Sequence, residues 1–517
     1  MKRLLTSLCA ASLLVTSLVS PAVMAQDRLP ALGDAASEDL SVGSERRIGE
    51  QVMREIRRDP DYLDDPVLLE YLQSIWQPLV KASRDRGNIS PDIDQAFAWE
   101  PFLVRDRSVN AFALPGGFVG VNLGLIAMTT TRDELASVLA HEMSHVTQRH
   151  IARGMANSQR QSLIGLASMI LGILAASRSN RVDGANAIFT GGQAVAAQGQ
   201  LNFSRDVERE ADRIGFGVLT QAGFAPGGMA AMFEKLDQAS RLNDSGGFPY
   251  LRTHPLTAER IGEARSRLGT APPVAPVSVL AHTVAQARAK VMMDSRVDAL
   301  RRWEALEAPS SASVADKLMA AYASALAATL LRDWARADTS LQLALGLVRG
   351  SPRSDAFAER EVVLLQVQSL IERGDAARAS EALKPYAKAD GVPSSRAVML
   401  LGAQVALSVD KDAVQRSVEE MQTWTALHPQ DATVWSQLSR SWEQMGHSLR
   451  ALRADAESRI AIGDLVGGVD RLRAGQKLAR STRTVDFIEA SVIEARLHEI
   501  ESQVRRREAE ERREGRG

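Results

Sequence analysis

Residues 131–145 constrain the fold of this chain more than any other segment, because they read Thr-Arg-Asp-Glu-Leu-Ala-Ser-Val-Leu-Ala-His-Glu-Met-Ser-His. Thr131 and Glu134 have the spacing of a capping box, which marks the start of a helix. From Leu135 onward, apolar residues recur at helical spacing. The segment is therefore predicted to be a helix with an apolar stripe along one side.

The same segment contains the pattern His-Glu-x-x-His. Residues four apart lie nearly one above the other on an α-helix, so His141 and His145 can both point a ring nitrogen at one metal ion. Glu142 lies beside them, a position that suits a general base. We therefore expect a hydrolytic site with one Zn²⁺ per chain. The alternative is a buried helix with two hydrogen-bonded histidines and a surface glutamate.

A hydrolytic zinc ion generally takes three protein ligands and leaves the fourth position for water. The best third ligand lies in the acidic segment 203–215, which is predicted to be helical and places Glu208 and Asp212 on one face. We assign Glu208 as the ligand and Asp212 as the acceptor that fixes a histidine tautomer. Glu210 points to another side of this helix and is expected at the surface. Taken alone, such an acidic helix is usually a solvated face.

A further histidine, His254, lies in the sequence Arg-Thr-His-Pro. The proline after it favours an extended backbone, so the ring can project from a loop into the cleft. There it would stabilise an oxyanion or occupy the open zinc position as a reversible lock. The alternative is a structural histidine in a turn.

The N-terminus has the pattern of a secretory signal peptide. Two basic residues precede an apolar run over residues 4–19, and the small side chain of Ala25 fits cleavage after that residue. Cys9 is the only cysteine and lies in the segment that would be removed. A chain of this length buries enough surface to do without disulfides. Together these features predict a periplasmic protein.

The charge of the chain excludes some classes of partner. Its formal net charge is −1, so no basic field attracts nucleic acid or anionic lipid. The apolar stretch 163–176 is shorter than the roughly 18 residues that a membrane span needs. We expect a helix there, near the active site, followed by a loop at 178–200. Contact with the outer membrane would be peripheral at most.

Apolar and turn-forming residues predict the elements before the zinc helix. Helical spacing predicts two helices, near residues 48–56 and 68–79. Extended patterns predict a strand at 97–99 and a strand, turn and strand over 110–121. This hairpin would lead into the zinc helix.

The second half of the chain is rich in amphipathic helices. Three of its breaks, at Gly374, Asp410 and Gly446, are 36 residues apart, close to the roughly 34-residue period of a tetratricopeptide repeat. Ala379 and Ala451 supply small residues where two helices of a repeat would pack tightly. An irregular helical bundle is the alternative. The predicted breaks between helices lie at Arg332, Gly374, Val409, Gly446 and Gly463.

These observations predict a mainly α (α+β) protein: a metalloprotease domain with a small β-sheet, followed by an α-helical tetratricopeptide-repeat solenoid. The proline-rich segment between the two reads as a linker. The predicted divisions are a signal peptide at 1–25, the protease domain at 26–269, a linker at 270–281, the repeats at 282–500 and a charged tail at 501–517.

Four blocks of sequence, in this order, resemble the HExxH…ExxxD zinc metallopeptidases that include the CAAX prenyl endopeptidases and HtpX. Within that family, a signal peptide and a C-terminal repeat domain make the chain similar to the periplasmic β-barrel assembly-enhancing proteases. The four blocks are residues 110–117, 141–145, 208–212 and 252–255.

The resemblance implies a gluzincin-type domain and a role for each site residue. His141, His145 and Glu208 would bind zinc, and Glu142 would be the base. His254 would act as a gate at the metal.

The resemblance also implies quality control at the outer membrane. The protein would degrade unfolded or misassembled outer-membrane β-barrel proteins and assist their assembly, with the repeats docking on the barrel-assembly machinery. The alternative is a repeat-based scaffold or chaperone with a latent or structural metal site. Glu142 favours the enzyme, because a structural site has no need of a base.

Overall fold

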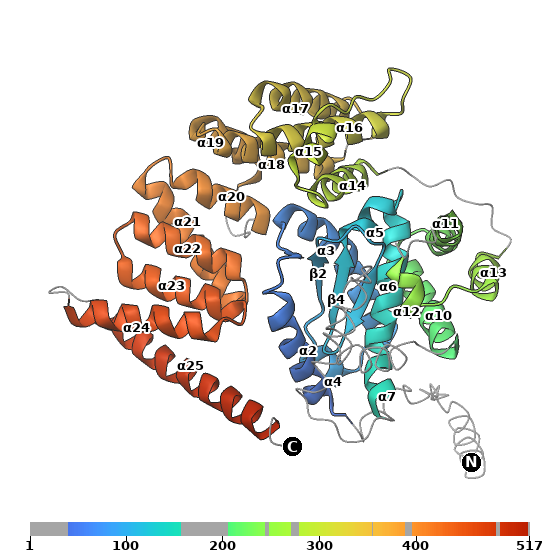
Figure 1. Ribbon diagram of the computed structural model, residues 1–517. Coiled ribbons are helices and arrows are strands. Elements are labelled where there is room, and N and C mark those ends of the chain that lie inside the picture. Colours follow the sequence, from blue (N-terminus) through green and yellow to red (C-terminus); the bar gives the residue numbers. More distant parts are fainter. Residues whose placement is uncertain are drawn as a thin grey trace, which may run out of the picture.

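The chain folds into two parts that lie side by side (Figure 1). We call residues 40–269 the N-terminal lobe and residues 279–514 the C-terminal array. The computed structural model describes residues 40–156, 205–242, 248–269, 279–353, 355–387, 395–481 and 486–514. The predicted signal peptide, the apolar stretch 163–176 and the loop 178–200 lie outside the described residues.

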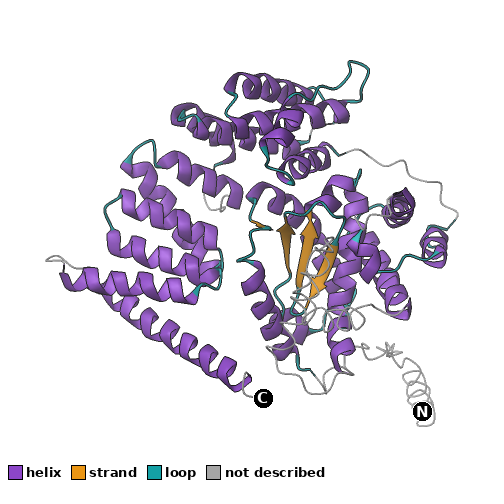
Figure 2. Cartoon of the chain, in the orientation of Figure 1, coloured by secondary structure: helices purple, strands orange, loops and turns teal. Residues whose placement is uncertain are grey.

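A small mixed sheet lies inside the N-terminal lobe, surrounded by helices (Figure 2). Its strand order is β1-β2-β4-β3, with β2 parallel to β4 and the two edge strands antiparallel to their neighbours. Every residue of β4 is buried. The strands are β1 (Tyr62–Leu63), β2 (Glu100–Val104), β3 (Ala111–Leu114) and β4 (Phe118–Asn122).

The predicted hairpin over 110–121 is confirmed as β3 and β4, joined by a turn at Gly116 and Gly117 with φ of 77° and 89°. The strand predicted at 97–99 is wrong by a few residues and lies at 100–104 instead. Trp99 has φ 50°, outside the extended region, and its carbonyl oxygen accepts a hydrogen bond from Trp76 Nε1 at 2.8 Å. A tertiary contact therefore interrupts the apparent strand.

Helices cover both faces of the sheet. The two helices predicted near residues 48–56 and 68–79 are confirmed as α2 and α3. Asp65 caps α3 by accepting a hydrogen bond from Leu68 N at 2.9 Å. The helices of the lobe are α2 (Val42–Ile56), α3 (Pro66–Asp85), α4 (Pro91–Ala96), α5 (Leu123–Met128), α6 (Arg132–Thr147), α7 (His150–Ala156), α10 (Arg205–Gln221), α11 (Gly227–Leu242), α12 (Pro249–Thr253) and α13 (Ala258–Ser266).

The C-terminal array consists of helices that pack against their sequence neighbours, and all five predicted breaks separate two helices. Gly374, Gly446 and Gly463 have φ near 80°, which a glycine adopts without steric cost. The helices are α14 (Leu280–Met292), α15 (Val297–Glu304), α16 (Val314–Leu331), α17 (Trp334–Arg349), α18 (Ala356–Glu372), α19 (Ala376–Leu383), α20 (Arg396–Ala406), α21 (Lys411–Leu427), α22 (Ala432–Gln444), α23 (Ser448–Ala461), α24 (Leu465–Ser481) and α25 (Phe487–Glu514).

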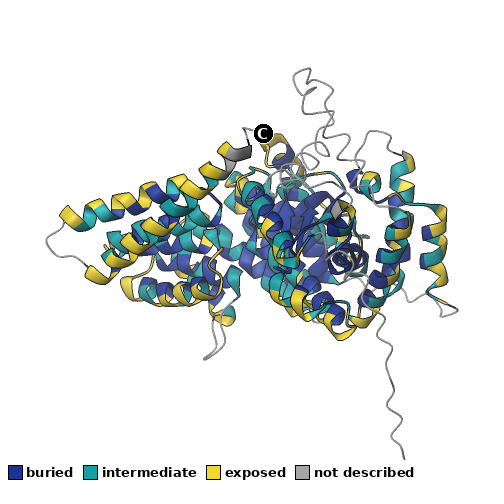
Figure 3. Cartoon of the chain, turned by 90° about the horizontal axis from the view of Figure 1, so that it is seen from below, coloured by how far each residue is buried: buried dark blue, intermediate teal, exposed yellow. Residues whose placement is uncertain are grey.

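Ion pairs inside the array recur at a nearly constant sequence separation. Arg373 contacts Asp338 across 35 residues, and Arg450 contacts Asp486 across 36. The predicted close-packing residues Ala379 and Ala451 are buried. In Figure 3 the array helices are buried along their inner sides and exposed along their outer sides. This separation is close to the roughly 34-residue period of a tetratricopeptide repeat.

The helix α14 joins the two parts, because it packs on α3 and α5 of the lobe and on α16 and α18 of the array. One cluster of buried apolar side chains runs from Leu63 of β1 to Leu365 of α18. The two parts therefore share a core.

Among the described residues, one helix, α16, is long and apolar enough to cross a membrane, and 61% of that stretch is buried inside the protein.

Candidate metal centre

The helix α6 begins at the predicted cap. Thr131 Oγ1 accepts a hydrogen bond from Glu134 N at 3.2 Å. The Glu134 carboxylate does not return to Thr131 as in a regular capping box; it accepts from Thr130 N at 2.7 Å. The cap fixes the start of α6, and its far end carries His141, Glu142 and His145, all buried.

The helix α10 crosses α6 at very short range. A Cβ atom at Gly215 would lie only 3.1 Å from the carbonyl oxygen of Ala140, so a larger side chain there would push the helices apart. Ala211, one turn earlier, is fully buried. This close contact brings Glu208 of α10 beside the two histidines of α6, as predicted.

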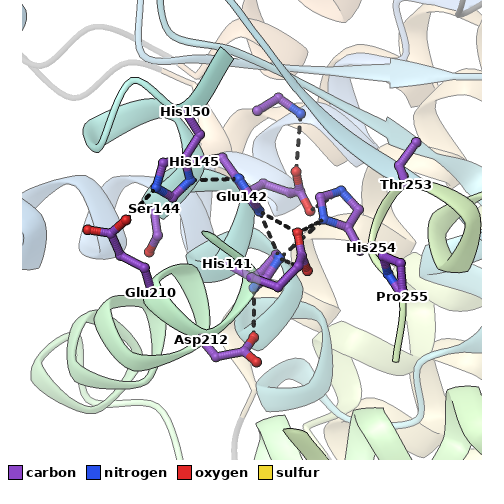
Figure 4. Close-up of polar contacts among 12 residues, drawn as sticks. His141, Glu142, Ser144, His145, His150, Glu210, Asp212, Thr253, His254 and Pro255 are labelled. Carbon is purple, nitrogen blue, oxygen red and sulfur yellow. Dashed lines mark hydrogen bonds and ion pairs between the residues drawn. The ribbon is translucent and has the colours of Figure 1, made fainter. Parts of the chain in front are cut away.

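The three predicted ligands converge with distances that fit one metal ion. Figure 4 shows the side chains of His141, His145 and His254 gathered at this point. His141 Nε2 and His145 Nε2 are 3.0 Å apart; His141 Nε2 lies 3.5 Å from Glu208 Oε2, and His145 Nε2 lies 3.5 Å from Glu208 Oε1. Donor atoms about 2.0–2.2 Å from a tetrahedral zinc ion are themselves separated by about 3.3 Å. Two imidazoles and a carboxylate are also the ligand types that zinc prefers in hydrolytic sites.

His254 is the fourth side chain of this cluster. Its Nδ1 atom lies 2.9 Å from Glu208 Oε1 and 3.4 Å from His141 Nε2. The four candidate ligand atoms all lie within 4.8 Å of one another. His254 follows α12, and Tyr250 stacks on its ring with centroids 4.7 Å apart. The ring thus lies where a fourth ligand would lie.

Glu142 connects the cluster to the edge strand β3. Its Oε2 atom accepts a hydrogen bond from Ala113 N at 3.1 Å. Its Oε1 atom lies 3.6 Å from His254 Nε2 and has no hydrogen-bond partner among the described residues. Burial raises the pKa of Glu142 above its usual value, so this carboxylate binds a proton more readily than one in water.

Asp212 lies behind His141, as predicted, with Oδ1 2.9 Å from His141 Nδ1. Arg260 of α13 binds the same carboxylate through Nε at 2.7 Å and Nη2 at 2.9 Å. Burial alone would raise the pKa of Asp212, but the contacts with His141 and Arg260 outweigh it and lower the pKa. Asp212 therefore stays ionised and can accept the His141 N–H.

Sequence reasoning missed Arg260. Its Nη1 atom lies 2.8 Å from Glu208 Oε2, so one guanidinium holds both Glu208 and Asp212 of α10. Its role depends on the packing of α13 against α10, which no local pattern announces. In the sequence it follows a helix cap at Thr257 and reads as an ordinary surface arginine.

Glu208 and His145 are in protonation states that suit metal binding. Burial alone would lower the pKa of His141, but its contacts with Asp212 and Glu208 outweigh burial and raise the pKa to about 10, so His141 must lose a proton when a metal binds. Burial alone would raise the pKa of Glu208, yet the neighbouring His254 and His141 hold it below its usual value. Burial lowers the pKa of His145 well below its usual value, and the charge on His141 lowers it further. An ionised carboxylate and a neutral imidazole are the forms that bind a metal.

The expectation that Glu210 lies at the surface is wrong. Its side chain is 14% exposed, and Oε2 accepts hydrogen bonds from His150 Nε2 at 3.0 Å and Arg153 Nη1 at 3.2 Å. These partners lie on α7, which follows α6 closely in the sequence and covers this side of α10. Sequence reasoning missed His150 as well, although it lies only five residues after His145.

Residues 70–268 match the sequence profile of peptidase family M48. A Vibrio cholerae relative is 36% identical over 273 residues, which cover 52% of this chain and 53% of the relative. The β-barrel assembly-enhancing protease of Escherichia coli is 29% identical over 465 residues, 90% of each chain. The mitochondrial metalloendopeptidase OMA1 of Saccharomyces cerevisiae is 29% identical over 197 residues, 37% of this chain and 53% of the relative.

Proposed function

Because residues 70–268 form a peptidase family M48 domain, we propose that this chain is a zinc-dependent metalloendopeptidase of the periplasm. It degrades misassembled outer-membrane β-barrel proteins and assists their assembly. The observation that carries the proposal is the convergence of His141, His145 and Glu208 on one point with Glu142 beside them. The E. coli relative, which matches over most of both chains, supports the link to β-barrel assembly.

In the proposed site, one zinc ion is held by His141, His145 and Glu208. When bound, it supplies Lewis acidity toward a water molecule and toward the scissile carbonyl. Asp212 fixes the orientation of His141, and Arg260 holds Asp212 and Glu208 in place.

Glu142 is the proposed general base. It takes a proton from the attacking water and passes it to the leaving amine. The raised pKa supports this role, because a base must also release its proton as an acid later in the reaction. The hydrogen bond from Ala113 N orients one carboxylate oxygen and leaves the other facing the cluster.

The proposed substrate is an extended segment of an unfolded protein. The edge strand β3 pairs with β4 on one side only, and Glu142 touches it at Ala113. A peptide that adds to this edge would form main-chain hydrogen bonds, which tolerate many sequences. Its backbone would then pass directly beside Glu142.

The C-terminal array is proposed to be a tetratricopeptide-repeat solenoid that binds clients and docks on the barrel-assembly machinery. Stacked helical hairpins form concave surfaces that suit extended ligands. A groove of about 920 Å³ lies between strands β1 and β2 of the lobe and the array. Its apolar walls include Trp99, Phe357 and Trp424. An unfolded chain could lie along it.

His254 is the proposed gate. With its ring beside Glu208 and His141, it lies at the position of a fourth ligand, which a hydrolytic zinc site leaves to water. Substrate would have to displace His254 before cleavage.

A scaffold or chaperone with a latent metal site is the second candidate. The burial of all four ligand residues favours it, because a closed site does not turn over. Both candidates share export to the periplasm, for which we propose cleavage after Ala25. N-terminal sequencing of the mature protein tests that site.

Zinc content and proteolysis of a misfolded outer-membrane β-barrel protein test the proposal, measured for wild type, Glu142→Gln and His254→Ala. Glu142→Gln should keep its zinc and lose about 10²- to 10⁴-fold in cleavage rate. His254→Ala should cleave faster than wild type if the ring is a gate. Cleavage by Glu142→Gln at the wild-type rate would overturn the role of the base, and slower cleavage by His254→Ala would indicate a direct catalytic role.

A further inference from the structure

The two candidate histidine ligands are held in different ways. His141 Nδ1 lies 2.9 Å from the carboxylate of Asp212. His145 Nδ1 instead lies 2.9 Å from another imidazole nitrogen, His150 Nδ1 (Figure 4). The His150 side chain is fully buried, and its other nitrogen, Nε2, is 3.0 Å from Glu210 Oε2. A histidine therefore stands between the second ligand and its acidic partner.

The geometry permits one consistent set of tautomers. His145 Nε2 faces the cluster, so as a neutral ligand His145 carries its proton on Nδ1. That proton is donated to His150 Nδ1, which must then be an acceptor. His150 consequently carries its own proton on Nε2 and donates it to Glu210. Each bond in the row has one donor and one acceptor.

Glu210 is fixed at the end of this row. Arg153 Nη1 donates to the same oxygen at 3.2 Å. The arrangement parallels the first ligand, where Arg260 fixes Asp212. Both acidic residues come from α10, two positions apart.

The backbone between α6 and α7 is shaped to bring His150 back to His145. Arg149 has φ 51°, in the left-handed region that non-glycine residues occupy rarely. Its guanidinium is buried and Nε donates to Glu45 Oε2 of α2 at 2.8 Å. This turn separates α6 from α7, which begins at His150.

We propose that His150 and Glu210 are positioning residues, which fix the tautomer and ring orientation of His145 for metal binding. This inference rests on the proposed metallopeptidase function and adds a second relay of hydrogen bonds to the one through Asp212. Hydrogen-bond partners behind a histidine ligand typically change metal affinity by about 10- to 100-fold.

Two nearly isosteric variants separate hydrogen bonding from packing. His150→Asn places an amide oxygen near the position of Nδ1 and can still accept from His145, whereas His150→Leu fills a similar volume without an acceptor. Glu210→Gln tests the end of the row. His282→Leu is the control for loss of a buried histidine, because His282 bonds Tyr71 and Thr129, away from the cluster. Asp206→Asn, with a side chain 87% exposed on α10, is the surface control.

The readouts are zinc affinity, measured by competition with a chelator, and the visible absorption spectrum of the Co²⁺-loaded full-length protein. His150→Leu should bind zinc about 10- to 100-fold more weakly and shift the Co²⁺ spectrum, and His150→Asn should recover most of the affinity. Glu210→Gln should lie between them, and both controls should match wild type. Wild-type affinity and spectrum in His150→Leu would overturn the inference while leaving the proposed function intact. A wild-type protein that binds no metal would overturn both.

Discussion

The N-terminal lobe and the C-terminal array place their charges differently. At the candidate metal centre, charged groups are buried and each contacts specific partners, as Arg260 does with Asp212 and Glu208. In the outer array, by which we mean residues 432–514 (α22 to α25), the buried side chains are mostly apolar, and ion pairs such as Arg450 with Asp486 lie at the surface, both side chains 37% exposed; Arg453 with Glu489 is a more buried exception. Buried ion pairs are sensitive to loss of one partner, whereas exposed pairs contribute little.

This difference indicates which kind of contact stabilises each part of the chain. The stability of the lobe depends on a few short polar contacts between particular side chains. The stability of the array depends on many apolar contacts, which other apolar residues can replace. Single substitutions should therefore have large and local effects in the lobe. In the outer array they should have small effects.

The largest effect is expected for Arg260→Met. It leaves the buried carboxylates of Asp212 and Glu208 without their shared cation, so the free energy of unfolding of the metal-free protein should fall by about 5 kcal/mol. Urea unfolding followed by circular dichroism measures the change. Arg209→Met is the matched control, since Arg209 is exposed and contacts Glu259 of the same helix α13. An unchanged midpoint for Arg260→Met would remove the contrast between the two parts.

A slightly smaller effect is expected for Arg288→Met, at the junction where α14 packs between the lobe and the array. Arg288 and Asp65 form a buried pair at 2.8 Å, and its loss should cost about 3–4 kcal/mol by leaving Asp65 charged and unpaired. Adding Asp65→Asn removes the charge and keeps the α3 cap, so the double variant should recover more than half of the loss. No recovery in the double variant would mean that packing, rather than charge, determines the effect.

The junction should also give the protein a pH dependence. Burial raises the pKa of Glu361 from 4.5 to about 7, despite the opposing charges of Arg360 and Arg288. Because the folded protein binds this proton more tightly than the unfolded chain, the stabilisation is complete below pH 4.5 and is lost as pH rises through 7.

Glu361→Gln should remove this contribution, which amounts to about 3 kcal/mol between pH 5 and pH 8. Urea unfolding of wild type and variant at both pH values measures it as the difference between the two pH effects. Tyr322 and Glu70 face the same carboxyl group from α16 and α3 and stay in place in the variant. Equal pH effects in both proteins would contradict the assignment to Glu361.

The smallest effect is expected in the outer array, for Arg450→Gln. The exposed pair with Asp486 should contribute less than about 1 kcal/mol, and the unfolding midpoint should barely move. Added salt should reduce the difference further, because exposed pairs are screened. A loss as large as that of Arg288→Met would show that the array, too, depends on specific charges.

Much of the candidate site could be predicted because it rests on local geometry. His141 with His145, and Glu208 with Asp212, are pairs four residues apart on helices, and helical periodicity alone places each pair on one face. The hairpin over 110–121 and the helix breaks of the array were likewise marked by glycines and apolar spacing.

The rest depends on contacts between segments far apart in the sequence. Arg260 reaches Asp212 from another helix, and Arg288 reaches Asp65 across 223 residues. Glu210 was expected at the surface because helical periodicity does not reveal that α7 covers that side of α10. The strand expected at 97–99 begins at Glu100 instead, because the carbonyl oxygen of Trp99 accepts a hydrogen bond from Trp76 Nε1. Sequence periodicity describes one helix or strand at a time, whereas the roles of these residues depend on contacts between two elements.

The most direct test of the account is the zinc stoichiometry of the full-length protein, measured by native mass spectrometry after EDTA treatment and reloading. The account predicts one tightly bound zinc ion per chain in wild type and none in Glu208→Ala, with His282→Leu loading as wild type does. A folded wild-type protein that takes up no zinc, or a Glu208→Ala variant that loads equally well, would contradict the claim that α6 and α10 together hold the metal.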